Sequence, residues 1–210
     1  MKTLTPSGLA NSRRGPIGPS VAAAACLVLL LSGCSATPRD ATREAWHEYL
    51  DTVRQQQAAG ATLEPGSEQE RQAVARFQNL LSDFKAPDFA SRVGEVYAED
   101  AFFNDTLETL HGAAEIEEHL VATAAALERG TVDFVDVIHG DGDYYFRWVM
   151  IVRSKRLAQG EEVISVGMSH VRFDAAGKVV LHQDFWDSTG GLFEHVSGLG
   201  WLLRRAKDRL

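Results

Sequence analysis

Several signatures of common enzyme classes are missing from this sequence. It contains no Gly-x-Ser-x-Gly elbow, no phosphate-binding P-loop, no dinucleotide-binding glycine fingerprint and no Cys-x-x-Cys pair. Each of these patterns fixes a nucleophile, a phosphate group or a redox thiol in a defined turn. Their absence argues against a serine hydrolase and against a nucleotide-dependent enzyme.

Positive charge and metal-ligand patterns are also scarce. The chain has 21 basic and 29 acidic residues and a formal net charge of −8. A net anion of this size argues against nucleic acid as a partner. The histidines His111, His119, His139 and His195 form neither an i, i+4 pair nor a His-x-His pattern. We therefore predict no metal site, and no motif indicates a cofactor.

The longest apolar run near the start is short. It extends from Val21 to Leu31, after the basic residues Arg13 and Arg14, and small residues follow it. About 20 apolar residues are needed to span a bilayer, so this run predicts a secretory signal peptide over residues 1–33 instead.

The end of that run resembles a bacterial lipobox, Leu31-Ser32-Gly33-Cys34. The resemblance implies that Cys34 is diacylated on sulfur and becomes the first residue of the mature protein. Two acyl chains suffice for stable anchoring. Since Ser35 is not acidic, the resemblance implies the outer membrane, facing the periplasm, if the cell is Gram-negative. A plain secretory signal with a chance cysteine is the alternative.

Removal of residues 1–33 would change both the cysteine content and the charge. Cys26 would be lost, so Cys34 would be the one remaining cysteine, and no internal disulfide, thiol nucleophile or cysteine metal site could form. Residues 1–33 also contain three basic residues and no acidic residue, so the formal net charge of the mature protein would be −11. General charge attraction to an anionic membrane is therefore not expected, and the lipid provides the anchor.

We predict four segments: a signal peptide at 1–33, a lipidated cysteine with tether and short helix at 34–67, a single domain at 68–195, and a basic C-terminal segment at 196–210. The short helix is predicted over 44–57, where Trp46, Tyr49, Leu50 and Val53 recur at helical spacing. Its apolar stripe either docks on the domain or stands off the membrane.

The domain changes its hydrophobic period from 3.6 to 2 near Gly130. Helices are predicted at 68–84, 89–98 and 113–127, with one strand between the last two at 101–110. Further strands are predicted at 131–139, 143–157, 161–173 and 178–187, because turn residues separate alternating runs. Helices followed by hairpin strands predict an α+β fold whose antiparallel sheet curls around a pocket.

The order of elements, with the ending His182-Gln183-Asp184-Phe185-Trp186-Asp187, resembles the SnoaL-like branch of the nuclear transport factor 2-like superfamily. The resemblance covers about residues 68–195. It implies a cone: a strongly curved, mostly antiparallel sheet packed on about three helices, with a deep, mostly apolar pocket. The superfamily includes isomerases, dehydratases, cyclases, epoxide hydrolases and binding domains, so the fold does not choose the function.

The last strand carries the main site candidates. Its period of two places His182, Asp184 and Trp186 on one face. The resemblance implies that Asp184 faces the pocket, where a carboxylate could act as a general base and His182 could share its proton. A structural His–Asp or Arg–Asp pair that fills the cone is the alternative.

The remaining candidates depart from the epoxide hydrolases of the superfamily. Arg147 lies in an apolar run, so we expect it to be buried and paired with Asp184. The family's water-activating Asp two positions later is Val149 here, and its pocket Tyr and Asn fall on Phe103 and Asp105. These departures argue against epoxide hydrolysis by that mechanism. Ligand contacts are predicted for Phe103, Asp105, Val149 and Trp186.

Three residues are left unplaced by the sequence. His170 lies on a strand whose pocket-facing phase the pattern does not decide, and a lone strand histidine is more often structural than functional. The helix at 68–84 contains no tyrosine that could match the oxyanion hole of ketosteroid isomerase, an enzyme of this superfamily. Tyr97 and Tyr145 are the other candidates for that role.

The C-terminal segment carries an apolar stripe followed by basic residues. One interpretation is a closing helix that covers the cone mouth or a dimer face. The other is a basic amphipathic helix that lies on a membrane surface.

The sequence thus predicts a lipid-anchored envelope protein whose pocket binds a small, largely apolar molecule. One alternative is an acid/base enzyme, an isomerase, dehydratase or hydrolase that uses Asp184 with His182 and Arg147. A second alternative is a protein-interaction or dimerisation module whose outer sheet face includes Gln183, Phe185 and Asp187, which leaves a homodimer open.

Overall fold

The computed structural model describes residues 38–60 and 63–209. The chain divides into two compact units, residues 1–43 and 44–210, and the description below concerns the second. The predicted signal peptide and the lipidation residue Cys34 lie outside the described residues. Within the described ranges, no helix has both the length and the apolarity to cross a bilayer.

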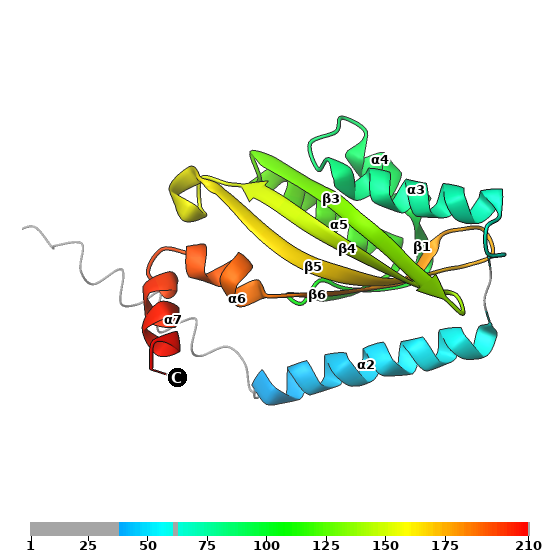
Figure 1. Cartoon of the computed structure of the whole chain (residues 1–210), viewed down its shortest axis with the longest axis horizontal. Helices are drawn as coiled ribbons and strands as arrows, with labels where there is room; N and C mark the ends of the chain where they lie inside the picture. Colours follow the sequence, from blue (N-terminus) through cyan, green and yellow to red (C-terminus); the bar gives the residue numbers. More distant parts are fainter. Residues whose placement is uncertain (1–37, 61–62, 210) are drawn as a thin grey trace, which may run out of the picture. The chain divides into compact units, whose positions relative to one another are not determined.

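One curved six-stranded sheet organises the domain (Figure 1). In spatial order the strands are β2 (Thr109–His111), β1 (Tyr97–Asn104), β6 (Val179–Trp186), β5 (Glu162–Phe173), β4 (Asp143–Arg153) and β3 (Arg129–Gly140). Only the β1–β6 pair is parallel among these described strands. The α+β fold and the hairpin order from β3 to β6 confirm the sequence-based prediction.

The single strand predicted at 101–110 is two strands. β1 ends at Asn104, and a turn then leads to the short antiparallel partner β2. Asp105 makes this turn, because its Oδ1 accepts the backbone N–H groups of Leu107 and Glu108, both at 2.9 Å. The strand also begins earlier than predicted, at Tyr97, since the helix predicted at 89–98 ends at Val96.

Three helices cover the inner face of the sheet: α3 (Glu68–Ser82), α4 (Phe89–Val96) and α5 (Gly112–Ala126). α3 begins after Ser67, whose hydroxyl caps it by accepting the N–H of Glu70 at 3.1 Å. Its side chain Phe77 packs on Phe146 of β4 and contributes to the main core. Burial of such aromatic and aliphatic side chains stabilises the fold by roughly 1.5–3 kcal/mol each.

A fourth helix, α2 (Pro38–Ala59), contains the predicted helix 44–57, and its part from Glu44 onward lies against the opposite, outer face (Figure 1). Tyr49 and Val53 pack on Phe102, Leu181 and Phe185 in a second apolar cluster. The docking alternative for this stripe is therefore confirmed. The last elements are the short α6 (Ser188–Gly191) and η2 (Phe193–His195), then α7 (Leu199–Lys207); η1 (Ala158–Gly160) joins β4 to β5.

Candidate pocket and its buried relay

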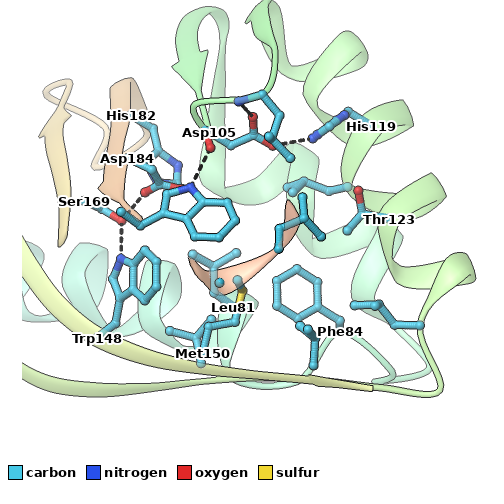
Figure 2. Close-up of a pocket in the computed structure, with 18 of the residues that line it drawn as sticks. Leu81, Phe84, Asp105, His119, Thr123, Trp148, Met150, Ser169, His182 and Asp184 are labelled. Atoms are coloured by element: carbon cyan, nitrogen blue, oxygen red, sulfur yellow. Dashed lines mark hydrogen bonds and ion pairs between the residues drawn. The ribbon is translucent and has the colours of Figure 1, made fainter. Parts of the chain in front are cut away.

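A cavity of about 200 Å³ lies between the inner face of the sheet and helices α3 and α5 (Figure 2). A water molecule occupies about 30 Å³ in the liquid, so the cavity is larger than a few waters. Most of its wall is apolar. The polar side chains on the wall are Asp105, His119, Thr123, Ser169, His182 and Asp184.

A chain of hydrogen bonds runs through the wall and converges on Asp184. Tyr97 Oη lies 2.8 Å from His182 Nδ1, and His182 Nε2 lies 2.9 Å from Asp184 Oδ1. From the other side, Trp148 Nε1 donates to Ser169 Oγ at 2.9 Å, and Ser169 Oγ donates to the same Asp184 Oδ1 at 2.5 Å. We call these five side chains the inner relay.

The direction of each proton in the inner relay follows from its members. An indole N–H can only donate, so Ser169 accepts from Trp148 and gives its own proton to Asp184. Full burial raises the pKa of Tyr97 well above its usual value, and the charges of Asp184 and Asp105 raise it further. The phenol therefore stays protonated and donates to His182 Nδ1, which assigns the His182 proton to Nε2, facing Asp184.

Asp184 is the point where the inner relay opens to the cavity. Its side chain is 17% exposed, whereas that of His182 is 2% exposed. Among the described residues, both hydrogen bonds to its carboxylate end on Oδ1. No hydrogen bond among the described residues ends on its other oxygen, Oδ2, which as a carboxylate oxygen can accept one.

A second histidine–carboxylate pair lines the pocket on the side of α5 (Figure 2). His119 Nε2, on α5, is 2.8 Å from Asp105 Oδ2, in the turn after β1. Trp186 Nε1 donates to the Asp105 carbonyl at 2.8 Å and so ties β6 to that turn. Phe103, Asp105 and Trp186, for which ligand contacts are predicted, all line the cavity.

The outer face of the sheet carries a second Tyr–His–Asp chain with the same atom order. Tyr49 Oη of α2 lies 2.8 Å from His170 Nδ1, and His170 Nε2 lies 2.8 Å from Asp143 Oδ1. Arg172 donates to that same Oδ1 at 2.6 Å, and Gln57 donates to Oδ2 at 3.3 Å. We call Tyr49, His170, Asp143 and Arg172 the outer relay.

The outer relay is a structural contact between α2 and the sheet. Burial opposes ionisation of Asp143, but hydrogen bonds from Arg172, His170 and Gln57 outweigh it and lower the pKa of Asp143. Burial lowers the pKa of His170 and raises that of Tyr49 to about 12. Both oxygens of Asp143 are occupied, so this chain holds α2 on the sheet. The structural interpretation of His170 fits this placement.

Two predicted site residues lie on the wrong face. Trp148 and Met150 of β4 line the cavity, so the alternation of the strand turns Arg147 and Val149 to the outer face. Arg147 is 55% exposed and pairs with Asp136 of β3, with Nε to Oδ1 at 2.7 Å. The predicted burial of Arg147 and its pairing with Asp184 are wrong. The run around Arg147 is apolar because both faces of β4 carry apolar side chains.

The predicted interaction face is also partly wrong. Phe185 lies under α2, with its ring centroid 5.8 Å from that of Tyr49, and Gln183 is buried and donates to Asn104. Asp187 caps α6 by accepting the N–H of Gly190 at 2.9 Å. These residues are therefore used within the fold.

The sequence pattern did not identify Trp148, Ser169 and His119 as pocket residues, nor Tyr97 as the partner of His182. The predicted strand began four residues after Tyr97, and a register shift between Tyr97 and Phe102 interrupts the alternation that would have placed it. For Ser169, the available signal was that Ser165 and Gly167, which share its face of the strand, are also small residues. Gly167 lies against the Trp148 indole, where a Cβ would overlap the ring.

Comparison with known proteins agrees with this geometry. The family model described as a SnoaL-like domain matches residues 74–182. A search of curated protein sequences gives no significant match.

Three solved structures illustrate the likeness in fold. A LEH-like epoxide hydrolase of M. tuberculosis is 14% identical, with 70% of this chain and 100% of that chain covered and a TM-score of 0.50. TsrD from Streptomyces laurentii is 13% identical, with 65% and 100% covered and a TM-score of 0.53. A ketosteroid isomerase-like fold from Catenulispora acidiphila, in complex with trimethylamine, is 15% identical, with 57% and 88% covered and a TM-score of 0.50. At these identities the likeness establishes the fold alone.

Proposed function

The chain belongs to the SnoaL-like domain family, and from that premise we propose that it is a lipid-anchored envelope protein whose pocket binds a small, largely apolar molecule. The molecule would carry one hydrogen-bond donor, which meets Asp184 Oδ2, and an apolar body, which fills the rest of the cavity. Pockets of this kind are mostly apolar, with a few placed polar groups that fix orientation.

The observation that carries the proposal is the contrast between the two relays. Both contain the order Tyr, His, Asp. In the outer relay a guanidinium and an amide occupy Asp143, whereas among the described residues the ion pairs of Asp184 include only His182. A partly buried carboxylate without a cation beside it is costly to keep. This free-energy cost is explained if Asp184 binds a ligand.

Lipid anchoring is supported by the sequence alone. The lipobox-like Leu31–Cys34 provides one cysteine at the position where a diacylglyceryl group would attach. The proposal places the pocket domain outside the cytoplasm, tethered to the envelope through the residues that follow Cys34.

Native mass spectrometry tests the binding proposal. Residues 35–210 contain the whole compact unit that begins at Glu44, and this protein would be measured before and after denaturation. We expect a co-purified small molecule that is lost on denaturation and is absent from Thr123→Trp, in which an indole fills the cavity. The matched control is Val121→Trp on the exposed side of the same helix. Retention of the same molecule by Thr123→Trp would contradict the proposal.

An acid/base reaction is the second candidate, favoured by the position of Asp184 Oδ2 at the cavity. In this mechanism Oδ2 removes a proton from the bound substrate, while Ser169 and His182 hold Oδ1. Ser169 and His182 thus replace Arg147 in the orienting role. Positioned general bases accelerate proton transfer by about 10²–10⁴-fold.

A generic proton-transfer substrate tests this candidate without knowledge of the natural one. 5-Nitrobenzisoxazole is small and apolar, and a base opens its ring by removing one C–H proton. We expect turnover by the protein that falls at least about tenfold in Asp184→Asn. Asp136→Asn, the same change on the outer face, should keep the rate. Equal rates in wild type and Asp184→Asn would remove Asp184 as a base.

A protein-interaction role is favoured by one different observation. On the outer face, beside the part that α2 covers, Ile164 and Val166 of β5 are 62% and 69% exposed. They lie directly across from Ile151 and Val149 of β4. Sedimentation of residues 35–210 tests this role: a dimer that Val166→Glu converts to monomer would support it, and a strict monomer would count against it.

A further inference from the structure

Positive charge is concentrated at the end of this acidic chain. The segment from residue 204 to residue 209 reads Arg-Arg-Ala-Lys-Asp-Arg, so four of its six residues are basic. The chain as a whole has a net charge of −8. Most of its surface is therefore repelled by an anionic surface, and this end is the part that such a surface would attract.

Helix α7 is held to the domain through one face. Arg204 Nη1 donates to the Glu194 carbonyl at 3.1 Å, and Lys207 pairs with the Glu194 carboxylate. Gly200 is buried and lies against the Glu194 backbone at a place where a Cβ would overlap the carbonyl. These contacts with η2 fix the rotation of α7 about its axis, so the direction of its other face is also fixed.

That other face combines large apolar side chains with exposed arginines. Trp201 is 62% exposed and Leu202 is 57% exposed. The Arg205 Cζ lies 5.8 Å from the centroid of the Trp201 ring, one helical turn away. Arg209 follows four residues later and is exposed. In water, these two exposed apolar side chains add no hydrophobic burial to the fold.

We propose that this face of α7, formed by Trp201, Leu202 and Arg205, together with Arg209 just beyond the end of the helix, binds the surface of an anionic phospholipid bilayer. Tryptophan is favoured at the boundary between headgroups and acyl chains, where its amphipathic ring is partly buried. Leu202 enters the same layer, and the two arginines bind lipid phosphates as bidentate donors. Charge complementarity selects an anionic occupant, and the exposed indole and leucine side chains select one with an apolar layer beneath its charged surface, which a phospholipid bilayer provides.

The proposed contact is independent of the pocket and of the lipid on Cys34. A single lipid anchor leaves a protein free to tumble about its tether, whereas a second contact through α7 would fix one orientation of the domain. Among the described residues, Gly191 and Leu192, which precede α7, line the pocket. The pocket wall therefore does not require α7, whose closing of the cone mouth is one of the predicted alternatives.

Vesicle co-sedimentation tests the proposal with residues 35–210, which carry no acyl group. We expect binding to vesicles that contain phosphatidylglycerol, little binding to phosphatidylcholine alone, and loss of binding at high salt. Arg205→Glu should weaken the binding by at least about fivefold, since each basic residue near an anionic surface contributes about 1 kcal/mol. Trp201→Ser with Leu202→Ser should abolish it.

The matched control is Ile164→Ser with Val166→Ser, which removes equally exposed apolar side chains from the sheet. This control should bind vesicles as wild type does. All substituted residues are exposed, and unchanged thermal unfolding will confirm that each variant folds. The proposal is overturned if wild type fails to bind phosphatidylglycerol vesicles, if the α7 variants bind as well as wild type, or if the α7 changes instead abolish a dimer.

Discussion

Tyr97 and Tyr49 donate to the Nδ1 atoms of two histidines that lie on neighbouring strands and point to opposite faces of the sheet. In both cases the phenol fixes the tautomer of the ring, so that Nε2 donates to an aspartate. What differs is the aspartate: Asp143 is saturated, and Asp184 keeps one oxygen toward the cavity. We therefore infer a ligand-binding role for Asp184 from the hydrogen-bond partner that its Oδ2 lacks among the described residues.

Replacement of Tyr97 by Phe tests the inner relay. It leaves His182 Nδ1 buried without a donor, and an unsatisfied buried polar atom costs about 1–3 kcal/mol. We expect the free energy of unfolding in urea to fall by that amount. Tyr145→Phe serves as the control, because Tyr145 stacks on His170 through its ring, at 4.7 Å between centroids. Equal stability of wild type and Tyr97→Phe would mean that the phenol does not hold His182.

The outer relay predicts a pH dependence. Burial lowers the pKa of His170 below its usual 6.5 in the folded protein, so the folded state favours the neutral ring. This contribution to stability is complete above about pH 6.5 and is lost as the pH falls through the folded pKa. Urea unfolding at neutral pH and at about pH 5 should show the loss, and His170→Asn should show a smaller one. A stability that rises on acidification would contradict the assignment.

The shared face of His182, Asp184 and Trp186 could be predicted from the sequence, because side chains on a strand alternate. The partners of these residues could not. Ser169 and Tyr97 come from strands whose phase or first residue the local pattern did not fix, and the partner of Arg147 depends on the register of β3. A bulge in β3 between Phe134 and Asp136 sets that register.

At the scale of helices and strands, the hydrophobic periods of the sequence predicted the helices and the hairpins but not the pairing of β1 with β6. This pair is parallel and joins residues about 80 positions apart, such as Phe103 and His182. Hairpins bring neighbouring segments together through turn residues, whereas a parallel pair leaves no signal at either segment. The pairing matters because it places Tyr97 and Phe103 beside His182.

Close packing between strands predicts the effect of a single methyl group. Gly167→Ala would drive a Cβ into the Trp148 indole, and overpacking costs roughly 1–3 kcal/mol. We expect a lower unfolding temperature and a displaced Trp148, visible as a change in tryptophan fluorescence. Gly94→Ala on α4 is the matched control, since it has open space around it and alanine is the better helix former. If both variants were equally stable, the packing of Trp148 on Gly167 would be looser than described.

In the molecule as a whole, the net charge and the proposed anchor have complementary roles. An acidic domain is not attracted to anionic lipid, so the lipid proposed on Cys34 would hold it at the membrane and the basic face of α7 would set its orientation. The pocket and the membrane contact lie on different elements, which allows each to be removed without the other.

Replacement of Cys34 by Ser tests the anchor. In a host that processes lipoproteins, wild type should incorporate labelled fatty acid and sediment with membranes, because the diacylglyceryl group proposed on Cys34 would carry two acyl chains. Cys34→Ser should lose the label completely. The substitution Cys26→Ser, within the predicted signal, is the control and should keep it. Labelled Cys34→Ser protein would place the lipid elsewhere and contradict the lipobox assignment.

Ligand binding beside Asp184 is best tested by a titration of residues 35–210 with N-phenyl-1-naphthylamine, a neutral aromatic amine that fluoresces in apolar surroundings. We expect saturable binding that Val121→Trp keeps, Thr123→Trp abolishes and Asp184→Asn weakens by about 10- to 100-fold, the range for a lost hydrogen bond to a charged group of about 1.5–3 kcal/mol. Absence of binding, or binding that Thr123→Trp leaves unchanged, would contradict the assignment of this cavity as a ligand site.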